Sequence, residues 1–170
     1  MKLWGVTGWK NSGKTGLMER LVTEFSARGL TISTIKHAHH SFDVDHRGRD
    51  SYRHREAGAK EVLLSSRNRW ALMHETRDED EATLDELLAK LYPVDLVLIE
   101  GFKREPHPKI EAHRAATGQP LIAPEDPTVR AIASDTPEAI PSLWNKGPIL
   151  HLDDVPGVAD LILAGTGLAR

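Results

Sequence analysis

The sequence predicts an α/β fold in which a mostly parallel, twisted sheet lies between layers of helices. Three observations predict this class. Apolar, β-branched runs alternate along the chain with segments whose apolar residues recur at helical spacing. A glycine-rich segment joins the first such run, Lys2 to Thr7, to the first helical segment. Val94 to Ile99 is apolar apart from Asp95, which is typical of a parallel strand covered on both faces.

The first part of the chain predicts a strand, a loop, a helix and a second strand. The strand Lys2 to Thr7 leads through the loop into a helix over Lys14 to Arg28. Gly29 is placed to end that helix, and Leu30 to Lys36 is rich in β-branched residues. This order is typical of a parallel, right-handed βαβ unit. One face of the helix carries the apolar residues Leu17, Met18, Leu21, Val22 and Phe25.

The middle of the chain predicts a short helix and a small antiparallel hairpin. Asp50 or Ser51 is placed to cap a helix that runs through Ala57 and stops at Gly58. Runs rich in apolar residues then flank a two-residue turn, which favours a hairpin. The expected strands and turn are Glu61 to Ser66, Arg69 to Glu75 and Arg67-Asn68.

The rest of the chain predicts a further helix, the buried strand, three short strands and a terminal helix. Acidic residues precede the helical pattern of Leu84 to Leu91, and Pro93 stops it. Open parallel sheets bind ligands beyond the carboxyl ends of their strands, so the functional residues are expected there. The later candidates are strands at Lys109 to His113, Val129 to Ala133 and Pro148 to Leu152, and a helix at Val155 to Leu163.

Composition limits the function classes. The 170 residues predict a single domain over residues 1–170. Lys plus Arg number 22 and Asp plus Glu number 25, a net charge of −3, and no long basic block indicates a nucleic-acid partner. The chain has no cysteine, and no apolar stretch approaches the roughly 20 residues that cross a bilayer. Because no leader is evident, we expect a cytoplasmic protein without nucleic-acid or membrane partners.

Gly8 to Thr15 reads G-x-x-x-x-G-K-T between an expected strand and an expected helix, the context of a phosphate-binding loop, or P-loop. This predicts the three-layer fold of P-loop NTPases. The glycines let backbone N–H groups turn toward phosphate oxygens, and the helix start adds its positive dipole. Lys14 is expected to act on the β and γ phosphates, and the Thr15 hydroxyl to coordinate Mg²⁺. The expected nucleotide-binding residues are Gly8, Trp9, Lys10, Asn11, Ser12, Gly13, Lys14, Thr15 and Gly16.

A second carboxylate is expected near the metal, and Asp95 and Glu100 are the candidates at the two ends of the buried strand. Five residues at about 3.3 Å each place them roughly 16 Å apart. Because ligands bind at the carboxyl end, Glu100 is the predicted catalytic and metal-binding residue. Its role would be to contact Mg²⁺ or to hold the attacking water. A solvated charge at the end of a strand is the alternative.

A histidine-rich segment, Lys36-His37-Ala38-His39-His40, begins at the carboxyl end of the second expected strand. It could bind a transition metal, bind an anion such as a phosphate or a pterin-type ligand, or form a solvated loop. The many nearby cations favour the anion, since metal sites seldom gather so much positive charge. Asp50 has two further interpretations, as a helix N-cap and as an Mg²⁺ ligand. The candidate anion-binding residues are Lys36, His37, His39, His40, Arg49, Asp50 and Arg53.

Asp135 follows the expected strand Val129 to Ala133, again at a carboxyl end. Its carboxylate could accept two hydrogen bonds from the N1 and N2 edge of guanine, which adenine does not offer. A turn-forming role before Thr136-Pro137 is the alternative.

Together these residues resemble the molybdopterin-guanine dinucleotide biosynthesis adaptor protein B (MobB) family of P-loop GTP-binding proteins. The resemblance covers the chain from its start to about Asp135. Arg49 stands where the family pattern has lysine, which keeps the charge and changes the donor geometry. The motifs that carry the resemblance are Gly8 to Thr15, Lys36 to His40, Asp43 to Asp45, Gly48 to Tyr52, Ala57 to Ala59, Val97 to Lys103, Pro108 to Glu111 and Ala131 to Asp135.

The resemblance implies a cytoplasmic homodimer that binds GTP with Mg²⁺ and hydrolyses it slowly at most. It also implies assistance to the guanylyltransferase that joins GMP to molybdopterin, with molybdopterin as a nearby ligand. The residues leave two other classes open. One is a small-molecule kinase or ligase that uses Lys14, Thr15 and Glu100 for phosphoryl transfer. The other is a metal chaperone that carries its metal on the histidines.

Overall fold

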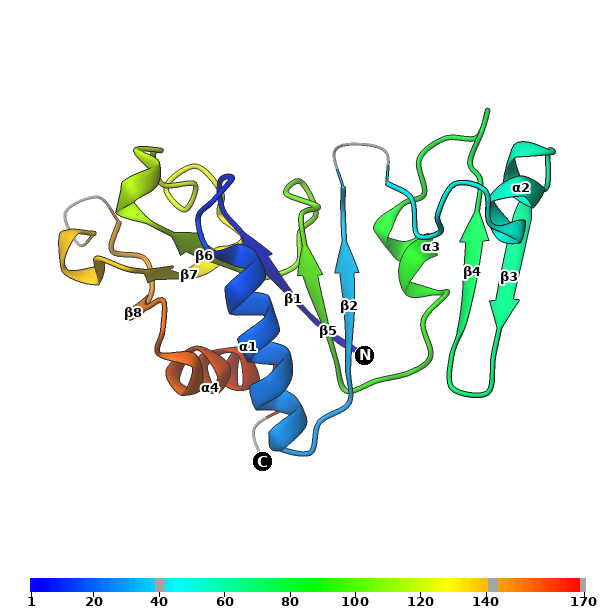
Figure 1. Cartoon of the computed structure of the whole chain (residues 1–170). Coiled ribbons are helices and arrows are strands. Elements are labelled where there is room, and N and C mark those ends of the chain that lie inside the picture. Colours follow the sequence, from blue (N-terminus) through cyan, green and yellow to red (C-terminus); the bar gives the residue numbers. More distant parts are fainter. Residues whose placement is uncertain (39–41, 141–143, 169–170) are drawn as a thin grey trace. The chain divides into compact units, whose positions relative to one another are not determined.

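The computed structural model describes residues 1–38, 42–140 and 144–168, and its chain forms two compact units (Figure 1). The first unit comprises Met1–His37 and Ala89–Arg170, and the second comprises Ala38–Leu88. A single domain over residues 1–170 stays a prediction. Within the described ranges, every helix is too short or too polar to cross a lipid bilayer.

The first unit is built on a six-stranded sheet whose neighbouring strands are all parallel. The strands lie in the order β2-β5-β1-β6-β7-β8. The predicted α/β class and parallel sheet are therefore confirmed. The first two strands are parallel as expected, and β5 lies between them. The strand bounds are β1 (Lys2–Thr7), β2 (Ile32–Lys36), β5 (Leu96–Glu100), β6 (Lys109–His113), β7 (Val129–Ser134) and β8 (Ile149–His151).

Helices α1 (Lys14–Ala27) and α4 (Val155–Thr166) pack on one face of this sheet (Figure 1). Residues of both helices share a core cluster with Trp4 and Val6 of β1. Ile132 alternates with the residues of β7 that belong to this cluster, so it faces the other side of the sheet. The connections that follow β6 and β7 cover that side, and they include the short 3₁₀ turns Ala115–Thr117 and Pro137–Ala139.

The helix ends confirm one prediction and correct another. Gly29 has a φ of 80°, and the next residue, Leu30, donates its N–H to the carbonyl of Phe25 at 3.1 Å, as expected at the end of α1. The prediction that Asp50 or Ser51 caps the next helix was wrong. Helix α2 (Asp50–Glu56) has Arg49 at its N-cap without a side-chain hydrogen bond, and Asp50 is its first helical residue. There a carboxylate still favours the helix, because it lies near the positive dipole end.

The second unit contains α2, the hairpin of β3 (Glu61–Ser65) and β4 (Trp70–His74), and α3 (Leu84–Leu88). The antiparallel hairpin is confirmed, and α3 ends earlier than Pro93 alone would require. Val62 is buried in β3, whereas its neighbour Leu63 faces Leu72 across the strands with both side chains exposed. Trp70 shares this side of β4 by the alternation of strand residues and is also exposed. We call Leu63, Trp70 and Leu72 the hairpin face.

Arg55 connects α2 to the segments before and after it within the second unit. Its guanidinium pairs with Asp45 at 2.5 Å, with Glu75 at 2.9 Å and with Asp43 at 3.0 Å. The hydrogen bond from Arg55 holds the pKa of the Asp45 carboxyl below its usual range. A guanidinium with several partners fixes geometry better than a single ion pair, so Arg55 ties α2 to the segment before it and to Glu75 after β4.

The amino end of β6 buries two basic side chains that differ in their hydrogen bonding. Lys109 donates from Nζ to the Glu105 carbonyl at 2.5 Å and to Thr128 Oγ1 at 2.6 Å. His107 is 7% exposed, and neither of its ring nitrogens has a hydrogen-bond partner among the described residues. Burial, together with the charge of Lys109, lowers the pKa of His107 to about 4.

We expect His107 to lower the stability of the folded protein in mild acid. The unfolded imidazole, with a pKa near 6.5, takes up a proton that the folded one accepts only near pH 4. The free energy of unfolding contributed by this group is therefore highest above pH 6.5 and falls by roughly 1–3 kcal/mol toward pH 4. Urea unfolding of His107→Gln should show a smaller loss between pH 7 and pH 4.5 than the unchanged protein. His54→Gln, at an exposed position of α2, is the control, and equal losses in all three proteins would contradict the prediction.

Candidate functional site

The loop between β1 and α1 has a backbone that requires glycine at two positions. Gly8 has a φ of 145°, and a Cβ there would lie 2.4 Å from the Ala112 carbonyl oxygen. Gly13 has a φ of 95°, and a Cβ there would lie 2.9 Å from Leu152 Cδ2. Either side chain would clash and would also strain a left-handed backbone. The loop therefore keeps its shape only with the glycines that the sequence motif supplies.

The start of α1 is an uncapped helix end. Gly13 is its N-cap and makes no side-chain hydrogen bond. The first hydrogen bond along the helix runs from the Leu17 N–H to the Gly13 carbonyl at 3.0 Å. The N–H groups of Lys14, Thr15 and Gly16 precede it and have no intrahelical acceptor. Such a cluster of N–H groups with the helix dipole behind it is suited to bind phosphate oxygens.

Lys14 lies over the loop. Its Nζ donates a hydrogen bond to the Trp9 carbonyl at 2.7 Å. Partial burial lowers the pKa of Lys14, the nearby Glu100 raises it, and Lys103 and Lys36 lower it. A cation held at the mouth of the loop by one carbonyl can exchange that acceptor for a phosphate oxygen. Contact of Lys14 with the β and γ phosphates stays a prediction.

Glu100 is the last residue of β5 and pairs in register with Val6, just ahead of the phosphate loop. Its Oε2 lies 3.6 Å from Lys36 Nζ at the end of β2. Asp95, before the start of β5, accepts hydrogen bonds from the N–H and hydroxyl of Thr31 at 2.8 and 2.7 Å. The predicted placement of these two carboxylates at opposite ends of the strand is confirmed. Glu100 and the exposed Thr15 are two groups at this edge that could hold a divalent cation.

Tertiary structure adds contacts that sequence reasoning missed. Lys103, in the segment after β5, has its Nζ 4.9 Å from the centre of the Trp9 ring. The Trp9 Nε1–H donates to the carbonyl of Pro120, in the segment after β6, at 2.7 Å. Trp9 thus contacts the segments that follow both strands flanking β1. The only signal in the sequence was that these segments follow strand carboxyl ends, which selects no single residue.

The histidine-rich segment is described only in part. His37 donates its N–H to the Glu100 carbonyl at 2.8 Å, and its ring lies 4.8 Å from that of Phe102. His39 and His40 lie outside the described residues. Arg49, Asp50 and Arg53 belong to α2 and its N-cap in the second unit, so their expected roles stay predictions. In the part of the chain that is described, no three histidine or acidic side chains gather as a metal-binding group would.

Asp135 follows β7 at the same carboxyl edge as the phosphate loop. Its Oδ1 accepts the N–H of Ala115 at 2.9 Å, which ties the segments after β6 and β7 together. The side chain is exposed, and a carboxylate has further acceptor capacity. The neighbouring Arg114 brings its Nε to 3.0 Å from where a Gly13 Cβ would stand. The structure thus brings Asp135 and a cation near the phosphate loop, and base recognition by Asp135 stays a prediction.

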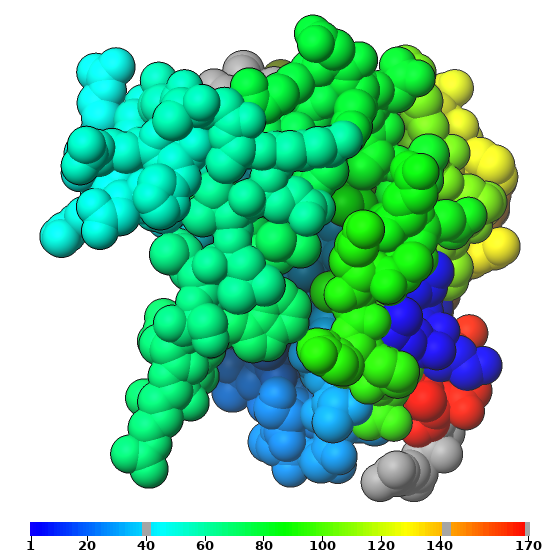
Figure 2. All heavy atoms as spheres, turned by 90° about the vertical axis from the view of Figure 1, so that its right-hand side faces the viewer, coloured from blue at the N-terminus to red at the C-terminus, as the bar shows by residue number. Residues whose placement is uncertain are grey.

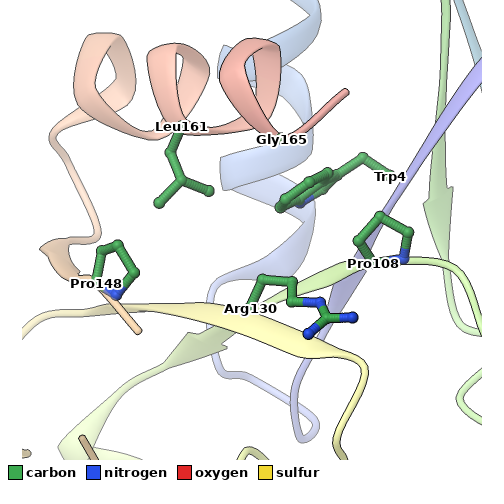
Figure 3. Close-up of a pocket in the computed structure, with 6 residues that line it drawn as sticks. All are labelled: Trp4, Pro108, Arg130, Pro148, Leu161 and Gly165. Carbon is green, nitrogen blue, oxygen red and sulfur yellow. The ribbon is translucent and has the colours of Figure 1, made fainter. Parts of the chain in front are cut away.

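A separate pocket of about 410 Å³ lies beneath α4 (Figure 3). Pro108 and Pro148 in its lining precede β6 and β8, so the pocket lies at the amino ends of these strands. Figure 3 shows Leu161 and Trp4 above it and Arg130 of β7 below. Parallel sheets bind ligands at their carboxyl ends, so this pocket is not the phosphate site.

Known proteins resemble this chain over most of its length. The family described as molybdopterin guanine dinucleotide synthesis protein B matches residues 3–135. A molybdopterin-guanine dinucleotide biosynthesis adapter protein of Haemophilus influenzae is 43% identical over 163 residues, covering 94% of this chain and 86% of that protein. The adapter protein of the same name from Escherichia coli is 40% identical over 164 residues, covering 95% and 91%.

The fold also has counterparts among solved structures. A crystal structure of Bacillus subtilis MobB has a TM-score of 0.74 and 28% sequence identity to this chain, and the comparison covers 98% of each. The three-layer fold predicted from the phosphate loop is thereby confirmed. The residues matched by the family include the phosphate loop, Glu100 and Asp135.

Proposed function

This chain belongs to the molybdopterin guanine dinucleotide synthesis protein B family, and from that premise we propose that it is a GTP-binding adapter. It acts in the biosynthesis of molybdopterin-guanine dinucleotide. There it assists, in the cytoplasm, the guanylyltransferase that joins GMP to molybdopterin. One observation carries the nucleotide part of the proposal: the uncapped start of α1 beside two positive-φ glycines, with Lys14 held at the loop by the Trp9 carbonyl.

In the proposed complex, the N–H groups at the start of α1 bind the phosphates of GTP. Lys14 leaves the Trp9 carbonyl and contacts the β and γ phosphates. Thr15 and Glu100 hold Mg²⁺, which when bound offsets phosphate charge. Hydrolysis is weak, in keeping with an adapter. Asp135 accepts hydrogen bonds from the guanine edge, and the exposure of this residue at the carboxyl end of β7 supports that choice.

The histidine-rich segment is proposed to bind molybdopterin. Lys36 and His37 lie at the end of β2, beside Glu100. Cationic and imidazole donors suit a ligand that carries a phosphate. The arginines of α2 add positive charge to the same stretch of sequence. A pterin-type anion is therefore the ligand proposed for this segment.

We also propose that the protein is a homodimer. The hairpin face supports this, because Leu63 is 60% exposed and its cross-strand partner Leu72 is 44% exposed. The space-filling view draws the atoms of the hairpin in green-cyan (Figure 2). Cross-strand apolar pairs of this kind usually gain stability from a covering surface, and a second copy supplies one with the same residues.

Calorimetric titration tests the nucleotide proposal. In the presence of Mg²⁺ we expect GTP to bind at least about tenfold more tightly than ATP, since a site that pairs with the guanine edge leaves groups unpaired with adenine. Repeating the titration with molybdopterin present, and with the guanylyltransferase added, tests the adapter role. Equal binding of both nucleotides would remove the guanine assignment. Turnover stimulated by a metabolite would favour a kinase, and stoichiometric metal in the purified protein would favour a chaperone.

The role of Glu100 is tested by a GTP hydrolysis assay run beside the same titration. Glu100→Gln should slow Mg²⁺-dependent turnover about tenfold or more and change GTP affinity by less than about threefold, because the metal acts mainly on developing charge. Glu19→Gln, at an exposed position of α1, serves as the control. An unchanged turnover rate in Glu100→Gln would contradict the assignment.

A further inference from the structure

Among the described residues, Glu111 in β6 is the only fully buried carboxylate, and it forms no salt bridge with any of them. Both of its oxygens accept the Ile122 N–H, at 2.9 and 3.0 Å, and Oε2 also accepts the Ala123 N–H at 2.7 Å. Burial raises the pKa of the Glu111 carboxyl, and the two amide donors oppose that rise. The Glu111 side chain thus anchors the backbone of residues 122 and 123, in the segment after β6.

The held segment reaches the phosphate loop. Pro120, just ahead of Ile122, accepts the Trp9 indole N–H at 2.7 Å. The Trp9 carbonyl in turn accepts the Lys14 ammonium at 2.7 Å. Glu111 itself pairs in register with Thr7, the residue before Gly8. Hydrogen bonds, joined by the short stretch from Pro120 to Ile122 and by Trp9 itself, therefore link the buried carboxylate to the lysine that is expected to contact phosphate.

An apolar side chain would fill the position of Glu111 without the desolvation that a carboxylate requires. Its neighbours in β6, Ile110 and Ala112, are apolar and equally buried. A carboxylate there is explained by what its oxygens hold, namely the amides of residues 122 and 123. Because a loop residue such as Trp9 is otherwise free to move on a surface, a fixed acceptor at Pro120 restricts it.

We propose that Glu111 is a positioning residue that fixes Trp9, and through it the phosphate loop, by anchoring the segment from Pro120 to Ala123. This inference rests on the proposed binding of GTP at the loop only for its effect on affinity. The anchoring itself is a property of the nucleotide-free protein. A prearranged loop binds its ligand without the loss of freedom that ordering it would require, so loss of the anchor should weaken binding.

The first test uses the indole proton of Trp9 and needs no nucleotide. In a ¹H–¹⁵N spectrum of the whole protein, Trp9→Phe identifies the Trp9 indole signal by its disappearance. Glu111→Gln should shift that signal and speed its exchange with solvent at least about fivefold, because an amide group offers one acceptor where the carboxylate offers two. Glu125→Gln, at an exposed position in the same segment, should leave it unchanged. An unmoved signal in Glu111→Gln would overturn the proposal.

The second test is a double-mutant cycle on GTP affinity. Glu111→Gln and Trp9→Phe should each weaken GTP binding about five- to twentyfold, and the double variant should be no weaker than the worse single one, because both break one series of contacts. Losses that multiply in the double variant would overturn the proposal. Glu111→Asp, which keeps the charge and shortens the side chain, replaces Glu111→Gln if the latter does not fold.

The two tests separate the anchor from the proposed function. If the unchanged protein binds no GTP and the Trp9 signal still responds to Glu111→Gln, the anchor stands and the nucleotide proposal fails. If GTP binds and the Trp9 signal does not respond, the anchor fails and the nucleotide proposal stands.

Discussion

Replacing Lys14 with alanine is expected to weaken GTP binding by at least roughly 100-fold, since each hydrogen bond between an ammonium and a phosphate contributes about 1.5–3 kcal/mol and Lys14 is expected to make more than one. The effect should be large because the side chain is already placed. Its Nζ is held at the loop by the Trp9 carbonyl, so binding requires an exchange of acceptors rather than a search. Calorimetry with GTP and Mg²⁺ measures the loss.

The far-ultraviolet circular dichroism of Lys14→Ala should match that of the unchanged protein. Lys14 is only partly buried and belongs to none of the core clusters, so its removal leaves the packing of α1 in place. Lys2→Ala, at an exposed position at the other end of β1, provides a lysine control that should bind GTP normally. Retained affinity in Lys14→Ala would remove the phosphate-loop assignment and the proposed function with it.

The combined substitution Leu63→Lys and Leu72→Glu is expected to convert the protein from dimer to monomer. The double variant removes two leucines of each protomer from the apolar surface that the protomers share. At about 1.5–3 kcal/mol for each buried leucine, the dissociation constant of the dimer should rise at least roughly 1,000-fold. The two positions face each other across β3 and β4, so opposite charges there preserve a favourable cross-strand pair. The hairpin itself should therefore stay folded.

Sedimentation at micromolar protein concentration measures this change. Tyr92→Glu, at an exposed aromatic residue of the first unit, is the control and should remain dimeric. A monomeric unchanged protein would contradict the homodimer proposal. A dimeric double variant would place the interface away from the hairpin face.

The local parts of the fold were predictable because their causes are local. Short-range patterns of apolar residues set each strand and helix, and Gly29 ends α1 because a positive φ is needed at that point. The phosphate loop followed from its motif between a strand and a helix. Strand length placed Glu100 and Asp95 at opposite ends of the strand, and the rule that ligands bind at the carboxyl end then selected Glu100.

The prediction of an N-cap at Asp50 or Ser51 was wrong for a physical reason. Both residue types are good caps, and the pattern of the sequence places them at the helix start. Arg55 pairs with Asp45 and Glu75, which lie before and after α2, and this network orients the helix from outside it. The backbone of Arg49 then occupies the cap position without a side-chain bond. Asp50 thus stands one position inside the predicted cap, where its carboxylate still interacts favourably with the helix dipole.

The sequence by itself determined the elements, the parallel sheet, the glycine-shaped phosphate loop and the strand end that carries Glu100. Tertiary structure alone decided that β5 lies between β1 and β2, which places Glu100 beside Val6. It also decided that Pro120 meets Trp9 and that Glu111 holds the segment between them. Such contacts join residues far apart in the chain, and they depend on which strands become neighbours. A local pattern carries no information about that choice, because it is settled by the packing of the whole unit.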